Sequence, residues 1–535
     1  VALPTGFLAT GISGGNNRVC ATLVSDSGDG EYYGATPYCW GGGSTGRLGN
    51  GLTSDSNTPS KVAPAPNSAT ALSAGHYHTC AILESAPTVN CWGQEYRGQL
   101  GNTIDPGSID QDTARSEPVR TLLPTGRTAT SMVSGYQHSC AIMDDGSLYC
   151  WGYNAYGQLG AEANTASTPV AVELPTGRTT SSVAAGYYHT CAILDDDSLY
   201  CWGKDDDGGQ LGDGATDSTG DTSTQNLVQP SLPSGRTATG LAAGEAHTCA
   251  ILDDGSIYCW GNNGYGRLGN DDSNEGNSDT PVAVSMPTGR TATDIASMKD
   301  HTCAIMDDDS LYCWGNGAYG NIGDGTTTTS NLVPTLVDLP AGESTKAVTV
   351  GNGHTCAISN TDVLYCWGWN NNAQLGDGST TNSGTPIDVG ATIIPGGTHA
   401  IAVEAGGYHT CIILVAETTH CWGDNEKGQL GDGTTTDRTT LVEPVSAPNA
   451  RGFAGYPVEM SERDFDADGF TNILDIHYSC DSGTYHDVFT RSSCASTDAG
   501  YYFDRSETSA LIVGDYVVCT SMDDGSLYCW GENNY

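Results

Sequence analysis

Basic residues are scarce in this sequence. Its 535 residues include 5 lysines and 15 arginines against 63 aspartates and glutamates, which gives a formal net charge of −43. A surface this negative repels nucleic-acid phosphates and anionic lipid headgroups. We therefore expect no nucleic-acid partner, and we interpret the acidic residues mainly as a solvated coat.

Long apolar runs and catalytic signatures are missing as well. No stretch reaches the roughly 18 apolar residues that a membrane-spanning helix needs, so we expect no membrane insertion. The sequence has no nucleotide-binding loop, no His-Glu-x-x-His motif and no Ser-His-Asp order, and acidic pairs are too frequent for any one of them to be informative. We expect that the protein is not an enzyme.

Cysteine, by contrast, is plentiful and paired. The 20 cysteines fall in ten local pairs, and none has the C-x-x-C spacing of zinc sites. Local pairing is typical of disulfides formed in an oxidising compartment, so we expect a protein outside the cell or on its surface. We take Val1 as a mature N-terminus or as the start of an expressed segment. The expected disulfides are Cys20–Cys39, Cys80–Cys91, Cys140–Cys150, Cys191–Cys201, Cys249–Cys259, Cys303–Cys313, Cys356–Cys366, Cys411–Cys421, Cys480–Cys494 and Cys519–Cys529.

The cysteine pairs belong to a repeat. Residues 140–152 read CAIMDDGSLYCWG, residues 249–261 read CAILDDGSIYCWG, and the Cys-Trp-Gly element recurs nine times. Successive first cysteines are 51 to 60 residues apart, except that the last step, from Cys411 to Cys519, is 108 residues. Periods of this length are typical of propellers and other repeat folds.

Each repeat predicts a β-hairpin. Cys140 and Cys150 are equidistant from Asp145, so a three-residue loop over 144–146 would place the two cysteines opposite each other. The third loop position needs a left-handed backbone, which Gly146 adopts easily. A cross-strand disulfide is then geometrically reasonable.

Both faces of these strands are apolar. In the third repeat Ile142 and Leu148 share the cysteine face, whereas Met143 and Trp151 lie on the other. Such strands need cover on both sides, and radially stacked blades provide it without long exposed edges. We therefore expect an all-β fold, a β-propeller of disulfide-linked hairpin repeats. A sandwich would show polar alternation, and an open solenoid would need polar caps.

Further motifs surround each hairpin. A Gly-Gln-Leu-Gly turn follows it, as at 157–160 and 428–431, and an Ala-Gly-x-x-His strand precedes most first cysteines. With the Asp-Gly hairpin and the Trp-Gly step, these motifs make residues 1–445 and 511–535 resemble the regulator of chromosome condensation family. The resemblance implies a seven-bladed propeller. It implies no single function, because members include a nuclear exchange factor and secreted inhibitors of β-lactamase.

The repeat count leaves the number of blades open. Repeats two to eight carry a histidine two residues before the first cysteine, whereas the first repeat has Arg18 and the ninth has Val517. Seven blades are favoured on this basis, with eight or nine as alternatives. We expect a propeller over 1–445, an irregular insert over 446–510 and an incomplete ninth hairpin over 511–535.

The recurring histidines suggest a metal ring at first sight. A residue that recurs once per blade is more simply a structural hydrogen bonder between blades, and we interpret the tryptophans in the same way as blade packing. The histidines are His78, His138, His189, His247, His301, His354 and His409.

The insert contains one candidate metal site. Residues 464–475 read DFDADGFTNILD, with aspartates at loop places one, three, five and twelve and a glycine at place six. Hard cations such as calcium take several oxygen ligands at once, including backbone carbonyls. The segment looks like the calcium loops of dockerin and thrombospondin type-3-like repeats. We predict a structural calcium ion held by Asp464, Asp466, Asp468, Phe470, Asn472 and Asp475.

Two functions fit these features. We favour an extracellular structural or assembly role, as the subunit of a surface filament, sheath or layer, in which the ninth hairpin completes a neighbour's ring and joins copies head to tail. The alternative is a secreted binding module, similar to an adhesin or inhibitor, that holds a protein or glycan through the loops on one propeller face.

Overall fold

The computed structural model describes residues 7–442 with short gaps, and beyond them strands alone. The gaps are 16, 27–31, 64–67, 84–87, 103–113, 162–164, 206–207, 216–222, 390–398 and 415–418. The described helices are single 3-10 turns, η1 (Ser44–Gly46) and η2 (Gly264–Gly266). No helix among these residues is long and apolar enough to cross a membrane.

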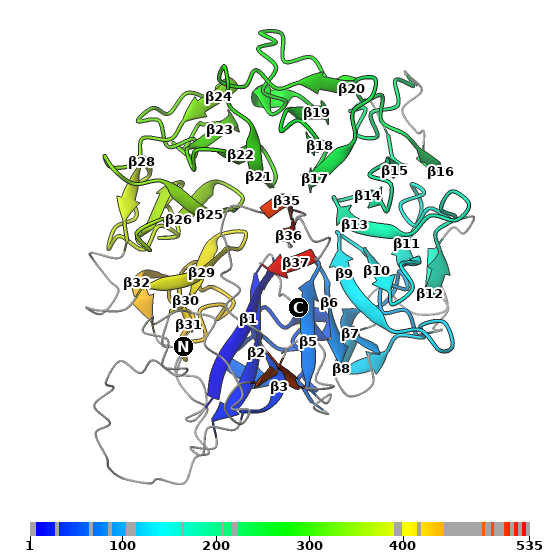
Figure 1. Ribbon diagram of the computed structural model, residues 1–535. Coiled ribbons are helices and arrows are strands. Elements are labelled where there is room, and N and C mark those ends of the chain that lie inside the picture. Colours follow the sequence, from blue (N-terminus) through cyan, green and yellow to red (C-terminus); the bar gives the residue numbers. More distant parts are fainter. Residues whose placement is uncertain are drawn as a thin grey trace. The chain divides into compact units, whose positions relative to one another are not determined.

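Eight antiparallel four-stranded units form a ring of blades (Figure 1). Each blade uses four consecutive strands, with the first nearest the centre of the ring and the fourth at its rim. The strands of blades 1 to 4 are β1 (Phe7–Gly15), β2 (Arg18–Asp26), β3 (Tyr32–Gly41), β4 (Ser56–Lys61); β5 (Ala69–Ala74), β6 (His78–Leu83), β7 (Val89–Gln94), β8 (Ala114–Arg120); β9 (Ala129–Ser134), β10 (His138–Met143), β11 (Leu148–Tyr153), β12 (Thr165–Ala171); β13 (Thr180–Ala185), β14 (His189–Leu194), β15 (Leu199–Lys204) and β16 (Ser223–Val228). Those of blades 5 to 8 are β17 (Ala238–Ala243), β18 (His247–Leu252), β19 (Ile257–Gly261), β20 (Ser278–Ala283); β21 (Ala292–Ser297), β22 (His301–Met306), β23 (Leu311–Asn316), β24 (Ser330–Leu336); β25 (Thr345–Val350), β26 (His354–Ser359), β27 (Leu364–Gly368), β28 (Ser383–Asp388); β29 (Ala400–Ala405), β30 (His409–Leu414), β31 (Thr419–Gly423) and β32 (Arg438–Val442).

The hairpins have the register that the sequence predicts. In blade 3, Cys140 pairs with Cys150 and Ile142 pairs with Leu148. Gly146 occupies the third loop position with a φ of 75°, in the left-handed region. The all-β propeller of hairpin repeats is therefore confirmed.

Eight of the predicted disulfides are present. Each joins the second and third strands of its blade, with Cα atoms 4.0 to 4.1 Å apart. The other two predicted pairs, Cys480–Cys494 and Cys519–Cys529, lie outside the residues whose side chains are described. The confirmed pairs are Cys20–Cys39, Cys80–Cys91, Cys140–Cys150, Cys191–Cys201, Cys249–Cys259, Cys303–Cys313, Cys356–Cys366 and Cys411–Cys421.

The apolar core lies between neighbouring blades. Trp202 of blade 4 is fully buried in the same cluster as Leu159 and Val172 of blade 3. Gly160, the last residue of the Gly-Gln-Leu-Gly turn, has a φ of 63°, and a Cβ atom there would lie 3.1 Å from Trp202 Nε1. Glycine is thus needed both for the backbone conformation and for the close approach of the next blade.

Blade 8 closes the ring against blade 1 without exchanging a strand. Ile12 and Trp40 of blade 1 share an apolar cluster with Ile413 of blade 8. The Asn57 side chain donates to the Gly433 carbonyl, and the Gly433 amide donates to the Asn57 carbonyl, both at 2.7 Å. We call this junction the seam.

The favoured count of seven blades is therefore wrong, and the alternative of eight is right. The first repeat forms a complete blade because its longer hairpin, β2 with β3, still pairs Cys20 with Cys39. Its missing histidine does not detach it from the ring, since Arg18 makes the connection to blade 2 by other hydrogen bonds.

Beyond residue 442 the described strands belong to two sheets, of which one is the sheet of blade 5, extended to seven strands, and the other is separate. Three of them repeat the order of the first three strands of a blade, and the first of the three pairs in parallel with β17. The other two form an antiparallel pair within a separate unit, residues 448–507. These strands are β35 (Thr508–Val513), β36 (Val518–Met522) and β37 (Leu527–Trp530), and β33 (Thr484–His486) and β34 (Cys494–Ser496).

Candidate functional site

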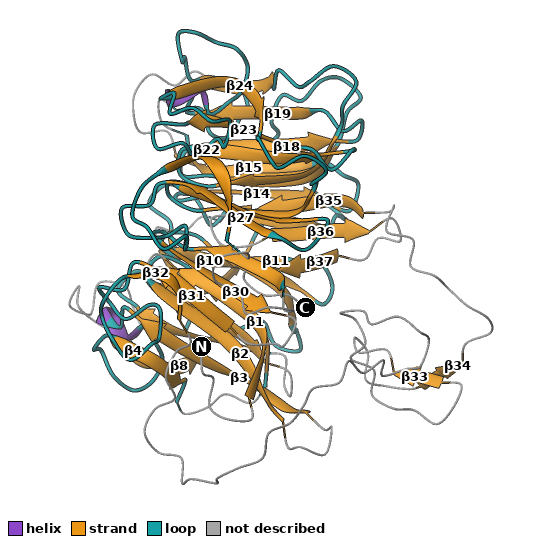
Figure 2. Ribbon diagram, turned by 90° about the vertical axis from the view of Figure 1, so that its left-hand side faces the viewer, coloured by secondary structure: helices purple, strands orange, loops and turns teal. Residues whose placement is uncertain are grey.

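Strand direction sorts the loops of every blade between two faces of the ring. Because neighbouring strands run antiparallel, the turn from the first to the second strand and the turn from the third to the fourth emerge on the same side. We call this side the turn face. The central hairpin and the link to the next blade emerge on the opposite side, the hairpin face. Figure 2 shows the strands that separate them edge-on.

A repeated hydrogen-bond relay joins each blade to the next beneath the turn face. The Thr190 hydroxyl of blade 4 donates to the Gln158 carbonyl of blade 3 at 3.0 Å, and Trp202 Nε1 donates to the same carbonyl at 3.0 Å. The hydroxyl then accepts from His138 Nε2 of blade 3, also at 3.0 Å. Equivalent histidine–hydroxyl pairs are His78–Ser139, His189–Thr248, His247–Thr302, His301–Thr355 and His354–Thr410.

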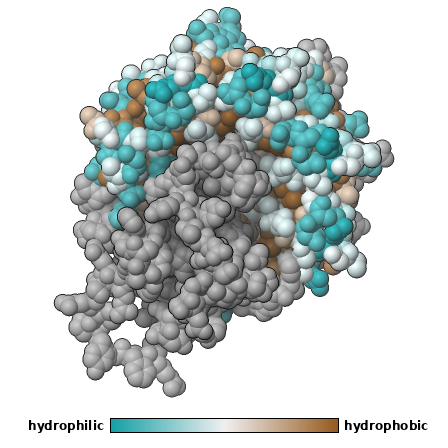
Figure 3. Space-filling view, in the orientation of Figure 1, coloured by the Kyte–Doolittle hydropathy of each residue, from teal (hydrophilic) through white to brown (hydrophobic). Residues whose placement is uncertain are grey.

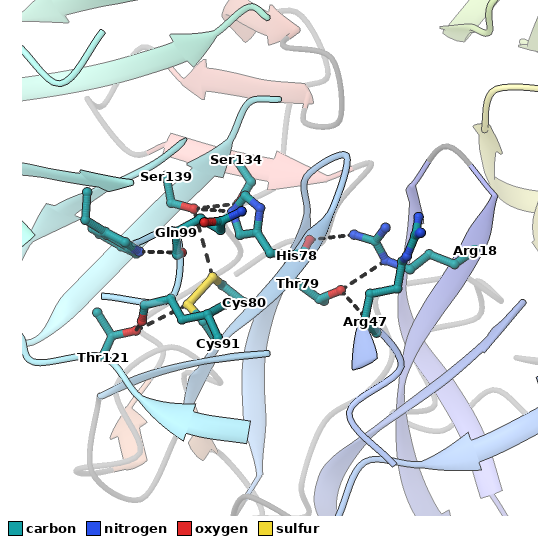
Figure 4. Close-up of a disulfide and its surroundings, with 12 residues drawn as sticks. Arg18, Arg47, His78, Thr79, Cys80, Cys91, Gln99, Thr121, Ser134 and Ser139 are labelled. Carbon is teal, nitrogen blue, oxygen red and sulfur yellow. Dashed lines mark hydrogen bonds between the residues drawn. A yellow bond between two sulfur atoms is a disulfide. The ribbon is translucent and has the colours of Figure 1, made fainter. Parts of the chain in front are cut away.

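Arg18 replaces the histidine at the junction of blades 1 and 2 (Figure 4). Its Nε donates to the Thr79 hydroxyl at 3.0 Å, and its Nη2 donates to the carbonyls of Gly75 and His78. Thr79 in turn donates to the Arg47 carbonyl at 3.1 Å. The predicted role of the recurring position as a hydrogen bonder between blades is thus confirmed for six histidines, and an arginine performs it in blade 1.

The relay histidines are neutral. Burial lowers the pKa of His138 and of His301 to about 3, because a charged imidazolium loses its hydration there. Nδ1 of His138 is buried and has no hydrogen-bond partner among the described residues, so a second proton would find no acceptor. These histidines therefore act as structural hydrogen-bond donors between blades.

A different set of side chains gathers at the surface of the turn face. The two residues between Gly and His in the first turn include at least one aromatic residue in three successive blades. Tyr77 of blade 2 and Tyr136 of blade 3 have ring centroids 5.2 Å apart and hydroxyl oxygens 3.0 Å apart. Tyr136 stacks on Tyr187 of blade 4 with centroids 5.2 Å apart and planes at 26°.

The third-to-fourth-strand turns extend this cluster outward. Tyr156 packs against Tyr188 with centroids 5.2 Å apart, and Tyr153 lies 5.9 Å from Tyr156. The Arg97 guanidinium lies 4.8 Å from the ring centroids of both Tyr96 and Tyr153.

We call this continuous surface the tyrosine arc. Two further cations contact it, Arg47 at 5.8 Å from the Tyr77 centroid and Lys204 at 5.5 Å from the Tyr156 centroid. All its side chains are partly exposed except that of Arg47, which is buried. Its members are Arg47, His76, Tyr77, Tyr96, Arg97, Tyr136, Tyr153, Tyr156, Tyr187, Tyr188 and Lys204.

Tyr136 and Tyr188 of the arc are uncharged hydrogen-bond donors. Burial and the adjacent Tyr77 raise the pKa of Tyr136, and burial with neighbouring phenols raises that of Tyr188 to about 12.

A smaller aromatic group lies on blades 6 to 8, where Tyr319 stacks on Trp369 with centroids 4.9 Å apart.

The hairpin face carries ion pairs in place of aromatic clusters. Arginines of the interblade links pair with aspartates of the central hairpins, as Arg178 does with Asp195 at 3.7 Å and Asp196 at 2.8 Å. Arg127, Arg236 and Arg290 repeat this arrangement. Figure 3 likewise shows mainly hydrophilic residues on the visible described surface. These cations are already matched by carboxylates and form no aromatic cluster.

The sequence singled out none of the arc residues. Its candidate calcium ligands, over 464–475, lie outside the described residues, and the described residues contain no group of three His, Cys, Asp or Glu side chains placed to hold a metal. The sequence feature that could have indicated the arc is the pair of residues between Gly and His. This pair is His-Tyr, Tyr-Gln and Tyr-Tyr in repeats two to four and is mostly non-aromatic elsewhere.

Comparisons with known proteins agree with the fold. The RCC1-like domain profile matches residues 36–412, more than half of the chain, and the RCC1 repeat profile matches residues 400–429. The ultraviolet-B receptor UVR8 of Arabidopsis thaliana is 28% identical over 408 residues, which cover 76% of this chain and 88% of UVR8. Human E3 ubiquitin-protein ligase HERC2 is 33% identical over 353 residues, which cover 65% of this chain but only 7% of HERC2.

Solved structures support the architecture. Human WBSCR16 superposes with a TM-score of 0.55 at 20% identity, over 67% of this chain and 95% of that chain. Yeast RCC1 (Prp20), solved with Kap60 bound, gives a TM-score of 0.54 at 20% identity, over 75% of this chain and 88% of that chain. The chain therefore belongs to the RCC1-like domain family, of which it is an eight-bladed, disulfide-linked member.

Proposed function

We propose that this protein is a secreted, non-enzymatic binding module that holds a protein partner on its tyrosine arc. The main support for this proposal is the tyrosine arc, a contiguous set of tyrosines and cations spread over four blades. Tyrosine and arginine are enriched in the energetically dominant centres of protein interfaces. A rigid ring that presents them preorganised loses little side-chain entropy on binding.

Two further observations support this proposal. Yeast RCC1, a propeller of the same fold, was solved with the protein Kap60 bound. Eight cross-strand disulfides in a chain without a described free cysteine support placement outside the reducing cytoplasm.

The test is selective capture followed by direct titration. Full-length protein, a Tyr136→Ala/Tyr187→Ala variant and an Arg178→Gln control on the hairpin face are exposed to extracellular proteins of the source organism. We expect a partner that the wild type and the control retain and the arc variant loses. The purified partner should then bind the arc variant at least about tenfold more weakly. A partner that binds all three proteins equally would contradict the proposal.

An assembly role is the second candidate, and one observation favours it. The three strands after residue 507 extend the sheet of blade 5 through the pairing of β35 with β17. The last of them, β37, lies at the edge of that sheet and pairs only with β36 among the described strands, and an edge strand of this kind can pair with a strand of another copy. Sizing of the full chain and of a chain lacking residues 446–535 tests this role.

A further inference from the structure

One arginine of the tyrosine arc has no carboxylate partner among the described residues. Arg97 has no side-chain carboxylate within ion-pair distance in this part of the chain, whereas each arginine of the hairpin-face array has at least one. In a chain with a net charge of −43, acidic groups are abundant enough to pair with any exposed cation. Among the described residues, the turn face thus keeps one guanidinium group, that of Arg97, with which no carboxylate of the same chain pairs.

Arg97 is held in a defined position. Its guanidinium lies 4.8 Å from the ring centroids of Tyr96 and Tyr153, and its Nε is buried without a hydrogen-bond partner among the described residues. A guanidinium has five N–H donors in a planar fork, and a carboxylate can accept two of them side by side. The two rings fix the orientation of the fork before any ligand arrives, so little entropy is lost on binding.

The neighbouring phenols add hydrogen-bonding groups but few open ring faces. Tyr136 already stacks on Tyr187 and meets Tyr77 edge-on, and Arg97 covers a face of Tyr153. Pyranose rings bind aromatic side chains by stacking on an open ring face, which these contacts restrict. Ring edges, hydroxyls and guanidinium groups instead match the carboxylates and apolar side chains of a polypeptide.

We propose that the tyrosine arc recognises an acidic polypeptide segment, whose carboxylates bind Arg97 and whose apolar side chains pack against Tyr136 and Tyr187. This inference rests on the proposed function and specifies its ligand. The net charge of −43 contributes to specificity, because it disfavours the binding of such a segment at sites that lack a cation without a carboxylate partner.

The experiment uses a fluorescent random copolymer of glutamate and tyrosine as the probe. Binding to the full-length protein is measured by anisotropy for the wild type, for Arg97→Gln and for the control Arg178→Gln. We expect saturable binding that weakens with salt, a loss of about tenfold or more in Arg97→Gln, and no change in Arg178→Gln. Equal thermal unfolding midpoints for the three proteins establish that each is folded.

Other outcomes overturn the inference. If the copolymer fails to bind, or binds Arg97→Gln as well as the wild type, the arc does not recognise acidic polypeptides. If polygalacturonate binds through Arg97 and the copolymer does not, the ligand is an acidic polysaccharide and the inference is wrong. A captured protein partner that still needs Tyr136 would then leave the proposed function standing and reject only its acidic specificity.

Discussion

Single hydroxyl groups connect neighbouring blades. Thr190 both donates to Gln158 and accepts from His138, so its position requires a residue that can do both at once. This explains why serine replaces threonine at 139 without loss of the link. The sequence could show that His-Thr-Cys recurs, but not that Arg18 would serve the same junction, because the carbonyls it reaches lie 57 to 60 residues away.

The relay histidines should make the fold sensitive to acid. His78, His138, His301 and His354 have pKa values lowered to about 3, whereas an unfolded histidine titrates near 6.5. Between those values only the unfolded state takes up the proton, so stability falls as the pH drops below about 6.5 and the loss continues to about 3. Each histidine contributes about 1.4 kcal/mol per pH unit in that window. We expect urea midpoints to fall steeply between pH 6.5 and pH 4.

A histidine replacement separates this effect from general charge effects. His301→Gln keeps an N–H donor for Thr355 but removes the titration, so its stability should depend on pH less steeply than that of the wild type. Parallel slopes for the two proteins would contradict the assignment.

At the scale of elements, local patterns were predictable and distant contacts were not. The hairpin register follows from ten-residue cysteine spacings and a loop that needs a left-handed third residue, both of which are local. The tyrosine arc joins turns about 50 to 60 residues apart, such as Tyr77, Tyr136 and Tyr187. Nothing in one repeat indicates that these rings touch, because their contact depends on the angle between blades.

Each disulfide should stabilise its own hairpin by a similar amount. Closing a ten-residue loop restricts the unfolded chain by about 2 to 3 kcal/mol. Replacing Cys249 and Cys259 together by alanine should lower the free energy of unfolding by about that amount while leaving the ring folded at room temperature. Denaturant unfolding under non-reducing conditions provides the measurement. A stability equal to that of the wild type would show that the folded hairpin gains nothing from its bond.

The seam is the junction where the relay is incomplete. Val19 stands where other blades present a hydroxyl, and Trp40 Nε1 is buried without a partner among the described residues. The Val19→Thr variant should supply an acceptor for His409 and raise stability by about 1 kcal/mol. The reverse change, Thr190→Val, should cost about 1 to 3 kcal/mol, because it leaves buried groups unpaired. If Val19→Thr is destabilising, the seam does not share the geometry of the other junctions.

At the scale of the whole molecule, ring closure decides how many repeats become blades. The family resemblance and the histidine count favoured seven, and both failed because closure depends on shape rather than on one signature residue. Blade 1 packs Ile12 and Trp40 against Ile413 of blade 8, which completes the circle with the eighth repeat. The ninth repeat supplies no residue to the apolar cluster described at this seam.

Closure of the ring by the first eight repeats predicts that the blades fold without the chain beyond residue 445. Deleting residues 446–535 removes no strand from blades 1 to 8 and none of the seam contacts. The shortened protein should stay soluble and folded, with a thermal midpoint within a few degrees of the full chain, because its buried core is intact. Circular dichroism and differential scanning calorimetry measure this, and light scattering compares the two assembly states. Unfolding of the truncated chain would show that the pairing of β35 with β17 is required for the ring. A folded monomer from a polymeric parent would instead assign the ninth repeat to contacts between copies.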